Sequence, residues 1–390
     1  MAEDVLVIGA GPAGIASAYH LQQAGISYKV VDRATEIAST WNSLYPSLKL
    51  NTTRFFSHMP ERKFPLSYGL FPSGKQYHRY LVKYAEDYNL NIHLGVRVDR
   101  VYPEGDGWRV ESSEGSAWYP AVISATGRFG SKIQPTFPGE DTFTGRIMHA
   151  SEYLGPGPFA GKRVMVIGNG PSGVDIATEL GRADAHKPVM LSQRTGVVLR
   201  PRYPWGLPKH LWMIIGEQLP DAISKPLMNR ILSLKFDNLD EIGIKAPTDA
   251  ESSAAGGTRG ADLIEVVKAR QVISVDGPDY FDGDTVVLDD GTQVQPDVVI
   301  LATGYKPVLW NYLEINVDTN DQGWPKRIDE PDHTYYLGKR QVVGYPGLYL
   351  VGVYYQGKGA MYNFNVEAAE AVDEIQAHLK QVKSRQLATS

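Results

Sequence analysis

The chain of 390 residues contains no cysteine. This absence excludes disulfide bonds, thiolate metal sites, iron–sulfur clusters, a cysteine nucleophile and a redox-active cysteine pair. The chain also lacks an apolar run of 18 residues, so we expect no segment that spans a membrane. Its first residues carry no cluster of positive charge, which argues against a secretory signal peptide and favours a cytoplasmic location.

Charge and composition narrow the class of protein further. Lys and Arg number 39 against 44 Asp and Glu, which gives a formal net charge of −5. Because no overall basic field attracts a phosphate polymer, we expect no nucleic-acid partner. Hydrophobic residues make up 43% of the chain and charged residues 21%. These values are typical of a soluble globular protein, and the length leaves room for two or three domains.

Two segments of the chain repeat one plan. Each has a four-residue apolar run, a turn with the spacing Gly-x-Gly-x-x-Gly, and a helical stretch that stops near a glycine, Gly25 or Gly181. Later in each copy a second apolar run leads into Ala-Thr-Gly, which ends at Gly127 or Gly304. The pattern predicts a buried parallel strand, a turn and a helix in both copies.

This duplication predicts an α/β fold with two dinucleotide-binding, Rossmann-like domains, the second inserted into the first. We place the first domain at residues 1–155 and 305–390, and the second at residues 156–304. We expect a final helix over residues 363–381. In the second domain, the apolar run 211–215 could touch a membrane or a partner, but we favour a buried helix.

The glycines of the two turns have separate physical roles. The first allows a tight turn, the second lets the backbone approach a pyrophosphate, and the third lets helix and strand pack closely, with the helix N-terminus facing the anion. A purely structural reading of either turn is much the weaker one, because both have the strand and helix context that a dinucleotide requires. The expected phosphate-site residues are Gly9, Gly11, Pro12, Ala13 and Gly14, and in the second copy Gly168, Asn169, Gly170, Pro171, Ser172 and Gly173.

The end of the next strand distinguishes the two nucleotides. Asp32 lies 18 residues beyond Gly14 and can accept hydrogen bonds from both ribose hydroxyls of FAD or NAD. At the equivalent place in the second copy stand Ser192 and Arg194. A 2′-phosphate is repelled by a carboxylate and held by a guanidinium, so the second copy predicts an NADPH site. The alternative is that Arg194 is a solvated surface charge.

An FAD site and an NADPH site in one chain predict hydride transfer from NADPH to the flavin. Disulfide reductases share this plan, but they pass the electrons to a pair of cysteines, and this chain has none. The electrons must therefore go to oxygen, to an external acceptor or to a protein partner.

The most specific motif lies between the two copies. Phe143, Gly145, His149 and Tyr153 match F-x-G-x-x-x-H-x-x-x-Y, the fingerprint of the class B flavin-dependent monooxygenases. The chain therefore resembles this family, and the final Tyr in place of Trp resembles its flavin-containing monooxygenase branch. Other matching segments are residues 39–41, 45–52, 192–195, 301–305 and 346–352. Residues 37–50 are also similar to the plant auxin-forming flavin monooxygenases, and the whole resemblance runs from about residue 5 to about residue 379.

The resemblance implies that residues 1–155 and 305–390 bind FAD and that residues 156–304 bind NADPH. It also implies cofactor contacts beyond the two turns. These are Asp32, Arg33, Thr40, Trp41, Asn51, Thr52, Val98, Ala125, Thr126, Gly127, His149, Ser192, Arg194, Thr303, Gly304, Tyr305 and Gly352. In the family the fingerprint histidine lies between the two sites and supports the linker. His149 inherits that role, and we assign it no acid or base function.

Asn51 is the residue that we single out for catalysis. In the flavin-containing monooxygenase branch an Asn stands here beside the isoalloxazine, where its amide can hydrogen-bond to the flavin edge and to bound nicotinamide. The auxin-forming branch has His at this point. The alternative is that Asn51 ends a strand or caps a turn, which the residue type alone would favour.

The resemblance implies an FAD- and NADPH-dependent monooxygenase, an oxidoreductase that forms a C4a-(hydro)peroxyflavin with O₂. Such chemistry needs no metal. The fingerprint that ends at Tyr153 resembles the flavin-containing monooxygenase branch, which favours transfer of one oxygen atom to a soft N or S nucleophile of a small-molecule substrate. One alternative is carbonyl chemistry, either Baeyer–Villiger oxidation or oxidative decarboxylation of a 2-oxo acid. Others are an NADPH–flavin electron transferase or oxidase, and non-catalytic cofactor sensing. A homodimer is left open by the sequence.

Overall fold

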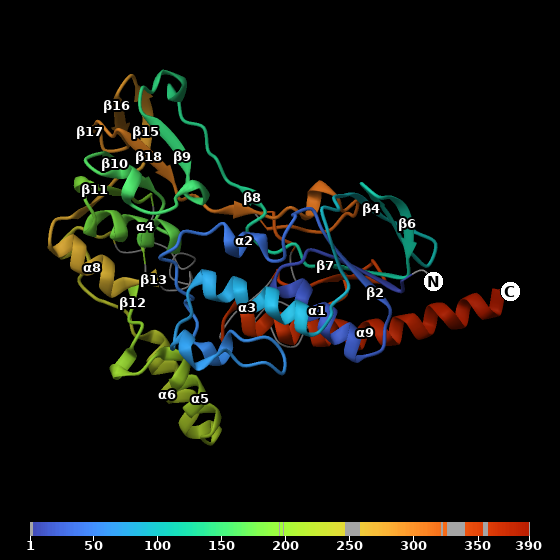
Figure 1. Ribbon diagram of the computed structural model, residues 1–390. Helices are drawn as coiled ribbons and strands as arrows, with labels where there is room; N and C mark the ends of the chain where they lie inside the picture. Colours follow the sequence, from blue (N-terminus) through green and yellow to red (C-terminus); the bar gives the residue numbers. More distant parts are fainter. Residues whose placement is uncertain are drawn as a thin grey trace. The chain divides into compact units, whose positions relative to one another are not determined.

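The computed structural model (Figure 1) describes residues 3–194, 196–197, 199–245, 258–320, 323–325, 340–353 and 358–389. Thr195, which belongs to one of the segments that match the family, lies outside them. The chain divides into two units: Met1–Ser131 with Tyr305–Ser390, and Lys132–Gly304. Each unit contains a five-stranded parallel sheet with helices, so the predicted α/β fold with two Rossmann-like units is confirmed.

The sheet of the first unit has the strand order β20-β7-β1-β2-β3. Its strands are β20 (Leu348–Leu350), β7 (Ala121–Ser124), β1 (Val5–Ile8), β2 (Tyr28–Asp32) and β3 (Ile92–Leu94). Every residue of β1 and β7 is buried, because a central parallel strand is covered on both faces. The apolar run that was predicted as a buried strand is therefore β1, which lies at the centre of this core beside β7.

Among its described residues, the first unit also contains four α-helices and an antiparallel sheet. The helices are α1 (Pro12–Gln23), α2 (Ser39–Asn42), α3 (Gly74–Asp87) and α9 (Ala360–Thr389), and α1 packs against α9. The antiparallel strands are β4 (Val98–Glu104), β5 (Gly107–Ser112) and β6 (Gly115–Tyr119). Helix α9 contains the predicted span 363–381 and extends beyond both of its ends.

The second unit repeats the parallel sheet with the order β14-β11-β10-β18-β9. Its strands are β14 (Val272–Val275), β11 (His186–Ser192), β10 (Arg163–Ile167), β18 (Val298–Leu301) and β9 (Arg146–His149). Its helices are α4 (Pro171–Arg182), α5 (Lys209–Glu217), α6 (Asp221–Ser233) and α8 (Gly260–Lys268). An antiparallel sheet of β15 (Pro278–Asp282), β16 (Thr285–Leu288) and β17 (Gln293–Val294) and a small pair, β12 (Leu199–Arg200) with β13 (Thr258–Arg259), belong to it as well.

The second unit starts earlier in the chain than the sequence suggested. The chain leaves the first unit through β8 (Ser131–Lys132) and returns to it through β19 (Tyr305–Lys306). Residues 132–155, which we assigned to the first domain, pack with the second, because β9 pairs in parallel with β18. The two ends of this unit meet, since the Ile133 N–H donates to the Gly304 carbonyl at 3.0 Å.

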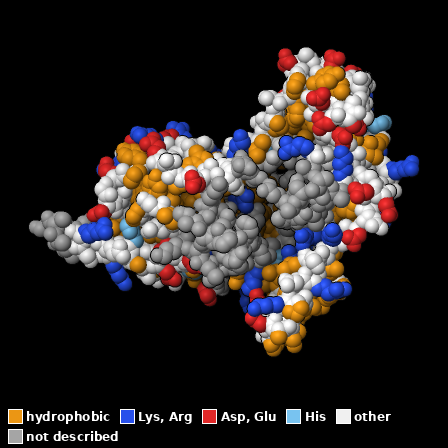
Figure 2. Space-filling view, turned by 180° about the vertical axis from the view of Figure 1, so that it is seen from behind, with side chains coloured by type: hydrophobic (Ala, Val, Ile, Leu, Met, Phe, Trp, Pro, Cys, Tyr) orange, Lys and Arg blue, Asp and Glu red, His pale blue; other side chains and the backbone are white. Residues whose placement is uncertain are grey.

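The run 211–215 is helical, as expected, but it is not fully buried. It lies in α5, where Ile215 is exposed and the four residues before it are half-buried. Helix α5 packs against α6, and Figure 2 shows apolar side chains gathered on this pair at the bottom of the view. Across the residues that the structure describes, no helix is both long and apolar enough to cross a bilayer.

Buried His210 on α5 predicts a loss of stability in acid. Burial, and then the charges of Lys209 and Arg202, lower the pKa of His210 to about 4. Because the folded pKa lies below the unfolded value, this stability is present above about pH 6.5 and is lost as pH falls towards 4, by up to about 3 kcal/mol. We expect the His210→Gln variant to show a flatter fall of the urea midpoint between pH 7 and 5. The same change at exposed His186 is the control, and an unaltered slope in His210→Gln would contradict the assignment.

Candidate functional sites at the two glycine turns

The two glycine turns have the same geometry. Gly9 follows β1 with φ +110°, and Gly168 follows β10 with φ +111°, a conformation that side chains rarely adopt. A Cβ on Gly9 would stand 2.6 Å from the Ala125 carbonyl oxygen, and a Cβ on Gly168 would stand 2.5 Å from that of Ala302. Glycine is therefore required at both positions. In each unit the alanine that limits the space belongs to the Ala-Thr-Gly segment at the end of the neighbouring strand.

The third glycine of each turn lets the helix pack on the strand. A Cβ on Gly14 would collide with the Gly9 carbonyl oxygen, and a Cβ on Gly173 with that of Gly168. The helices that follow, α1 and α4, each have 12 residues, begin with Pro, and have neither a side-chain cap nor an acidic residue in the first turn. Their N-terminal N–H groups and positive dipole ends are available to an anion, as a pyrophosphate site requires.

The middle glycines leave room in front of each turn. A Cβ on Gly11 or on Gly170 would meet no heavy atom of another described residue within 4 Å. The space beside these two positions is the space that a pyrophosphate needs for a close backbone approach. Both turns therefore fit the phosphates of a dinucleotide.

Asp32 closes the first turn at the end of β2. Its carboxylate accepts from the N–H of Ala10 at 2.7 Å and from that of Ala34 at 2.9 Å. Arg33, beside it, is exposed. A carboxylate held in place by two backbone donors can also accept from ribose hydroxyls, which stays the predicted role of Asp32.

The sequence analysis assigned Ser192 and Arg194 together to the 2′-phosphate of NADPH, but the two side chains have different surroundings at the end of β11. The Ser192 hydroxyl is buried and donates to the Asp276 carbonyl at 2.9 Å, whereas Arg194 is exposed. Between them lies Gln193, which the sequence analysis did not single out and whose side chain is fully buried. Counting residues from the first glycine does not find it, because Asp32 lies 23 residues beyond Gly9 and the same count from Gly168 ends at Leu191. The parallel pairing of β10 with β11 is needed to identify the position.

The strand ends beside the turns carry the other predicted contacts. Ala125 is buried in the first unit, and Thr126 and Gly127 follow it at the carboxyl edge of the sheet. The Gly352 N–H, after β20, donates to the buried Glu367 carboxylate at 2.6 Å. In the second unit, the Thr303 hydroxyl donates to the Ile133 carbonyl at 2.6 Å, next to Gly304. Tyr305, where the chain returns to the first unit, packs edge-on against Phe129.

The remaining predicted FAD contacts lie in three different elements of the first unit. Trp41, which follows Thr40 in α2, packs edge-on against Tyr77 with ring centroids 4.6 Å apart. Asn51 is exposed in a bend, and its amide makes no hydrogen bond within the described part of the chain, whereas Thr52 is buried and bonded to Ser57. Val98 begins β4 and packs against an apolar cluster.

His149 is fixed in the second unit by hydrogen bonds at both ring nitrogens. Its Nδ1 accepts from the Ser151 N–H at 3.2 Å, and its Nε2 lies 3.3 Å from the Gly304 carbonyl, to which it donates. Burial lowers the pKa of His149, so the ring stays neutral near pH 7. Tyr153, at the end of the fingerprint, donates to Glu179 of α4 at 3.0 Å. The fingerprint therefore connects Gly304, at the end of the second Ala-Thr-Gly segment, to helix α4, which follows the second glycine turn.

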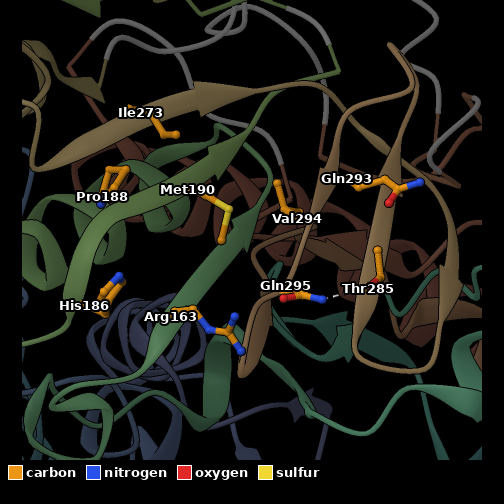
Figure 3. Close-up of a pocket in the computed structure, with 9 residues that line it drawn as sticks. All are labelled: Arg163, His186, Pro188, Met190, Ile273, Thr285, Gln293, Val294 and Gln295. Atoms are coloured by element: carbon orange, nitrogen blue, oxygen red, sulfur yellow. Dashed lines mark hydrogen bonds between the residues drawn. The ribbon is translucent and has the colours of Figure 1, made fainter.

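A hollow of about 420 Å³ on the second unit lies away from these residues (Figure 3). It lies at the amino ends of the parallel strands, where Arg163 begins β10 and His186 begins β11, opposite the carboxyl edge that carries the glycine turn. The Arg163 guanidinium is paired with Asp297 at 2.8 Å. None of the predicted site residues lines the hollow, so we do not assign it to the dinucleotide.

Known proteins resemble the chain over its whole length. Residues 6–202, about half of the chain, match the family model described as pyridine nucleotide-disulphide oxidoreductase. The chain is 29% identical over 398 residues to the probable indole-3-pyruvate monooxygenase YUCCA8 of Arabidopsis thaliana, covering 97% of this chain and 91% of the relative. It is 30% identical to the indole-3-pyruvate monooxygenase YUCCA1 of Oryza sativa subsp. japonica, covering 79% and 78%. The solved flavin-containing monooxygenase from Stenotrophomonas maltophilia has a TM-score of 0.69 at 26% identity, covering 97% and 99%.

Proposed function

Because the chain belongs to the pyridine nucleotide-disulphide oxidoreductase family and, within it, to the class B flavin-dependent monooxygenases, we propose that it oxygenates a soft nitrogen or sulfur nucleophile of a small organic substrate. The enzyme uses FAD and NADPH. One atom of O₂ enters the substrate and the other leaves as water, with two electrons from NADPH. The absence of cysteine agrees with oxygen, rather than a disulfide, as the acceptor.

The flavin, when bound, supplies hydride acceptance from NADPH and the activation of O₂. The protein's own contribution is binding, orientation and exclusion of water. In the first unit, the α1 N-terminus and Asp32 would hold the FAD pyrophosphate and ribose. In the second, the α4 N-terminus would hold the NADPH pyrophosphate, and Arg194 would pair with its 2′-phosphate.

Asn51 is the residue that supports oxygen transfer to an N or S nucleophile rather than to a carbonyl group. Its exposed amide makes no hydrogen bond within the described residues, so both its donor and its acceptor are available to a cofactor or substrate. A neutral amide can hold a proton at the reacting oxygen by a hydrogen bond, and protonated oxygen transfers to soft nucleophiles. The cap hypothesis for Asn51 requires a hydrogen bond from this side chain to the backbone.

A second function, oxidative decarboxylation of a 2-oxo acid, is favoured by the relatives, which are named as indole-3-pyruvate monooxygenases. Both reactions consume NADPH and O₂, so consumption alone does not separate them. The products do, because a sulfide gives a sulfoxide, whereas a 2-oxo acid gives CO₂ and a shortened acid.

The deciding experiment measures NADPH oxidation and products with a thioether, a tertiary amine and indole-3-pyruvate as separate substrates. We expect the thioether or the amine to accelerate NADPH oxidation, with one equivalent of oxygenated product for each NADPH. The second function would be favoured if only indole-3-pyruvate accelerates NADPH oxidation and if CO₂ is released in proportion to the NADPH consumed. NADPH oxidation that yields only H₂O₂ with every substrate would indicate an oxidase.

A further inference from the structure

Gln193 occupies in the second unit the strand position that Asp32 occupies in the first. In each unit the N–H of the first turn glycine donates to the carbonyl of the residue just before this position, at 2.8 Å in the first unit and 3.1 Å in the second. The parallel register agrees, since the last residue of the central strand pairs with that same preceding residue in both sheets. Because side chains alternate along a strand, Asp32 and Gln193 project from the same face.

The residue that follows is an exposed arginine in both units, Arg33 in the first and Arg194 in the second. A cation at this position is therefore common to the two sites and does not by itself distinguish their nucleotides. The difference lies one residue earlier, where the first unit has a carboxylate and the second a neutral amide.

The surroundings of the two side chains also differ. Both oxygens of Asp32 accept backbone hydrogen bonds. Gln193 is 0% exposed, and its N–H donates to the Val275 carbonyl at 2.9 Å. Neither polar atom of its side-chain amide has a hydrogen-bond partner among the residues that the structure describes. A buried amide that has lost its water and gained no partner is unfavourable. Such a group at the edge of a ligand site indicates that the ligand supplies the partner.

We propose that the Gln193 amide hydrogen-bonds to the 2′-phosphorylated ribose of NADPH and sets the preference of the second unit for NADPH over NADH. The inference rests on the NADPH site assigned to that unit. A carboxylate here would repel the 2′-phosphate and accept from a free 2′-hydroxyl, whereas an amide carries no charge and can donate to the phosphate oxygen. In this arrangement Arg194 supplies the positive charge that attracts the 2′-phosphate. Gln193 carries no negative charge that would repel it.

The Gln193→Leu variant tests this role with two measurements that move in opposite directions. Removal of an unpaired buried amide raises the melting temperature of the FAD-loaded, NADP⁺-free protein by roughly 2–4 °C. Loss of the hydrogen bond weakens NADP⁺ binding, measured by calorimetry, about 10-fold. Gln295→Leu is the matched control, because Gln295 is an exposed glutamine of the same unit, in the hollow of Figure 3.

The Gln193→Glu variant tests the charge argument. We expect NADP⁺ to bind at least about 100-fold more weakly and NAD⁺ to bind as well as before or better, so that the ratio of the two affinities reverses towards NAD⁺. Gln295→Glu, which adds the same charge away from the site, should leave that ratio within about 2-fold of the unmutated protein.

A lower melting temperature of Gln193→Leu with unchanged NADP⁺ affinity would overturn the proposal and make Gln193 a packing residue. An unchanged affinity ratio in Gln193→Glu would overturn it as well. Neither measurement depends on oxygen transfer. If the oxygenated product proves to be an acid from a 2-oxo acid, the proposed function fails while the assignment of Gln193 stands.

Discussion

Gly173→Ala should destabilise the second unit and abolish NADP⁺ binding, whereas Gly170→Ala should weaken binding without a loss of stability. The added Cβ of Gly173→Ala would collide with the Gly168 carbonyl oxygen and lie 2.9 Å from its carbonyl carbon. Backbone atoms cannot move aside as a flexible side chain can, so we expect a loss of about 1–3 kcal/mol or more in the free energy of unfolding. The turn would also open, which removes the aligned N–H groups at the start of α4.

Gly170 provides the matched comparison. Its φ of −67° is accessible to alanine, and an added Cβ meets no heavy atom of another described residue within 4 Å. The folded unit should therefore tolerate Gly170→Ala with its melting temperature nearly unchanged, while the methyl group fills the space through which the pyrophosphate approaches. Calorimetry should then show at least about a 10-fold loss of NADP⁺ affinity. A stable Gly173→Ala protein with full affinity would contradict the turn geometry.

Asn51→Ala should uncouple NADPH oxidation from oxygen transfer. Both glycine turns remain intact, so FAD content and the rate of hydride transfer should stay within a modest factor of the unmutated enzyme. Loss of a hydrogen bond of about 1–3 kcal/mol lowers the share of oxygen that reaches the substrate by roughly 10- to 100-fold. The measurement is H₂O₂ and oxygenated product formed for each NADPH consumed.

Two further variants sharpen the result at position 51. Asn311→Ala removes an exposed asparagine elsewhere in the same unit and should leave coupling unchanged. Asn51→His installs the residue of the auxin-forming branch and should raise turnover of 2-oxo acids if this position governs the reaction. Full coupling in Asn51→Ala would show that the residue has no part in oxygen transfer.

The glycine turns could be predicted from sequence because their chemistry is local. A tight turn, a close strand–helix contact and an anion at a helix N-terminus each need a residue type at a fixed spacing. The position of Gly9 or Gly173 therefore follows from the pattern. Asp32 was nearly as accessible, since one helix and one strand set its distance from the turn to within a few residues.

Other features depend on partners far away in the chain. The assignment of β9 to the second unit follows from its pairing with β18, about 150 residues later, and no local pattern encodes that choice. The half-buried state of α5 depends on what packs against it. The sequence analysis did not identify Gln193. It compared Asp32 with the charged Arg194, which lies one residue beyond the position that matches Asp32 in the strand register.

The hydrogen bond between Ile133 and Gly304 has a consequence for the engineering of the chain. A module can be inserted into another without disturbing its host when the module's two ends lie together, as they do at this pair. The same geometry gives the boundaries for excision: residues 132–304, not 156–304, are the span to express alone, because the longer span keeps the edge strand β9 on its sheet.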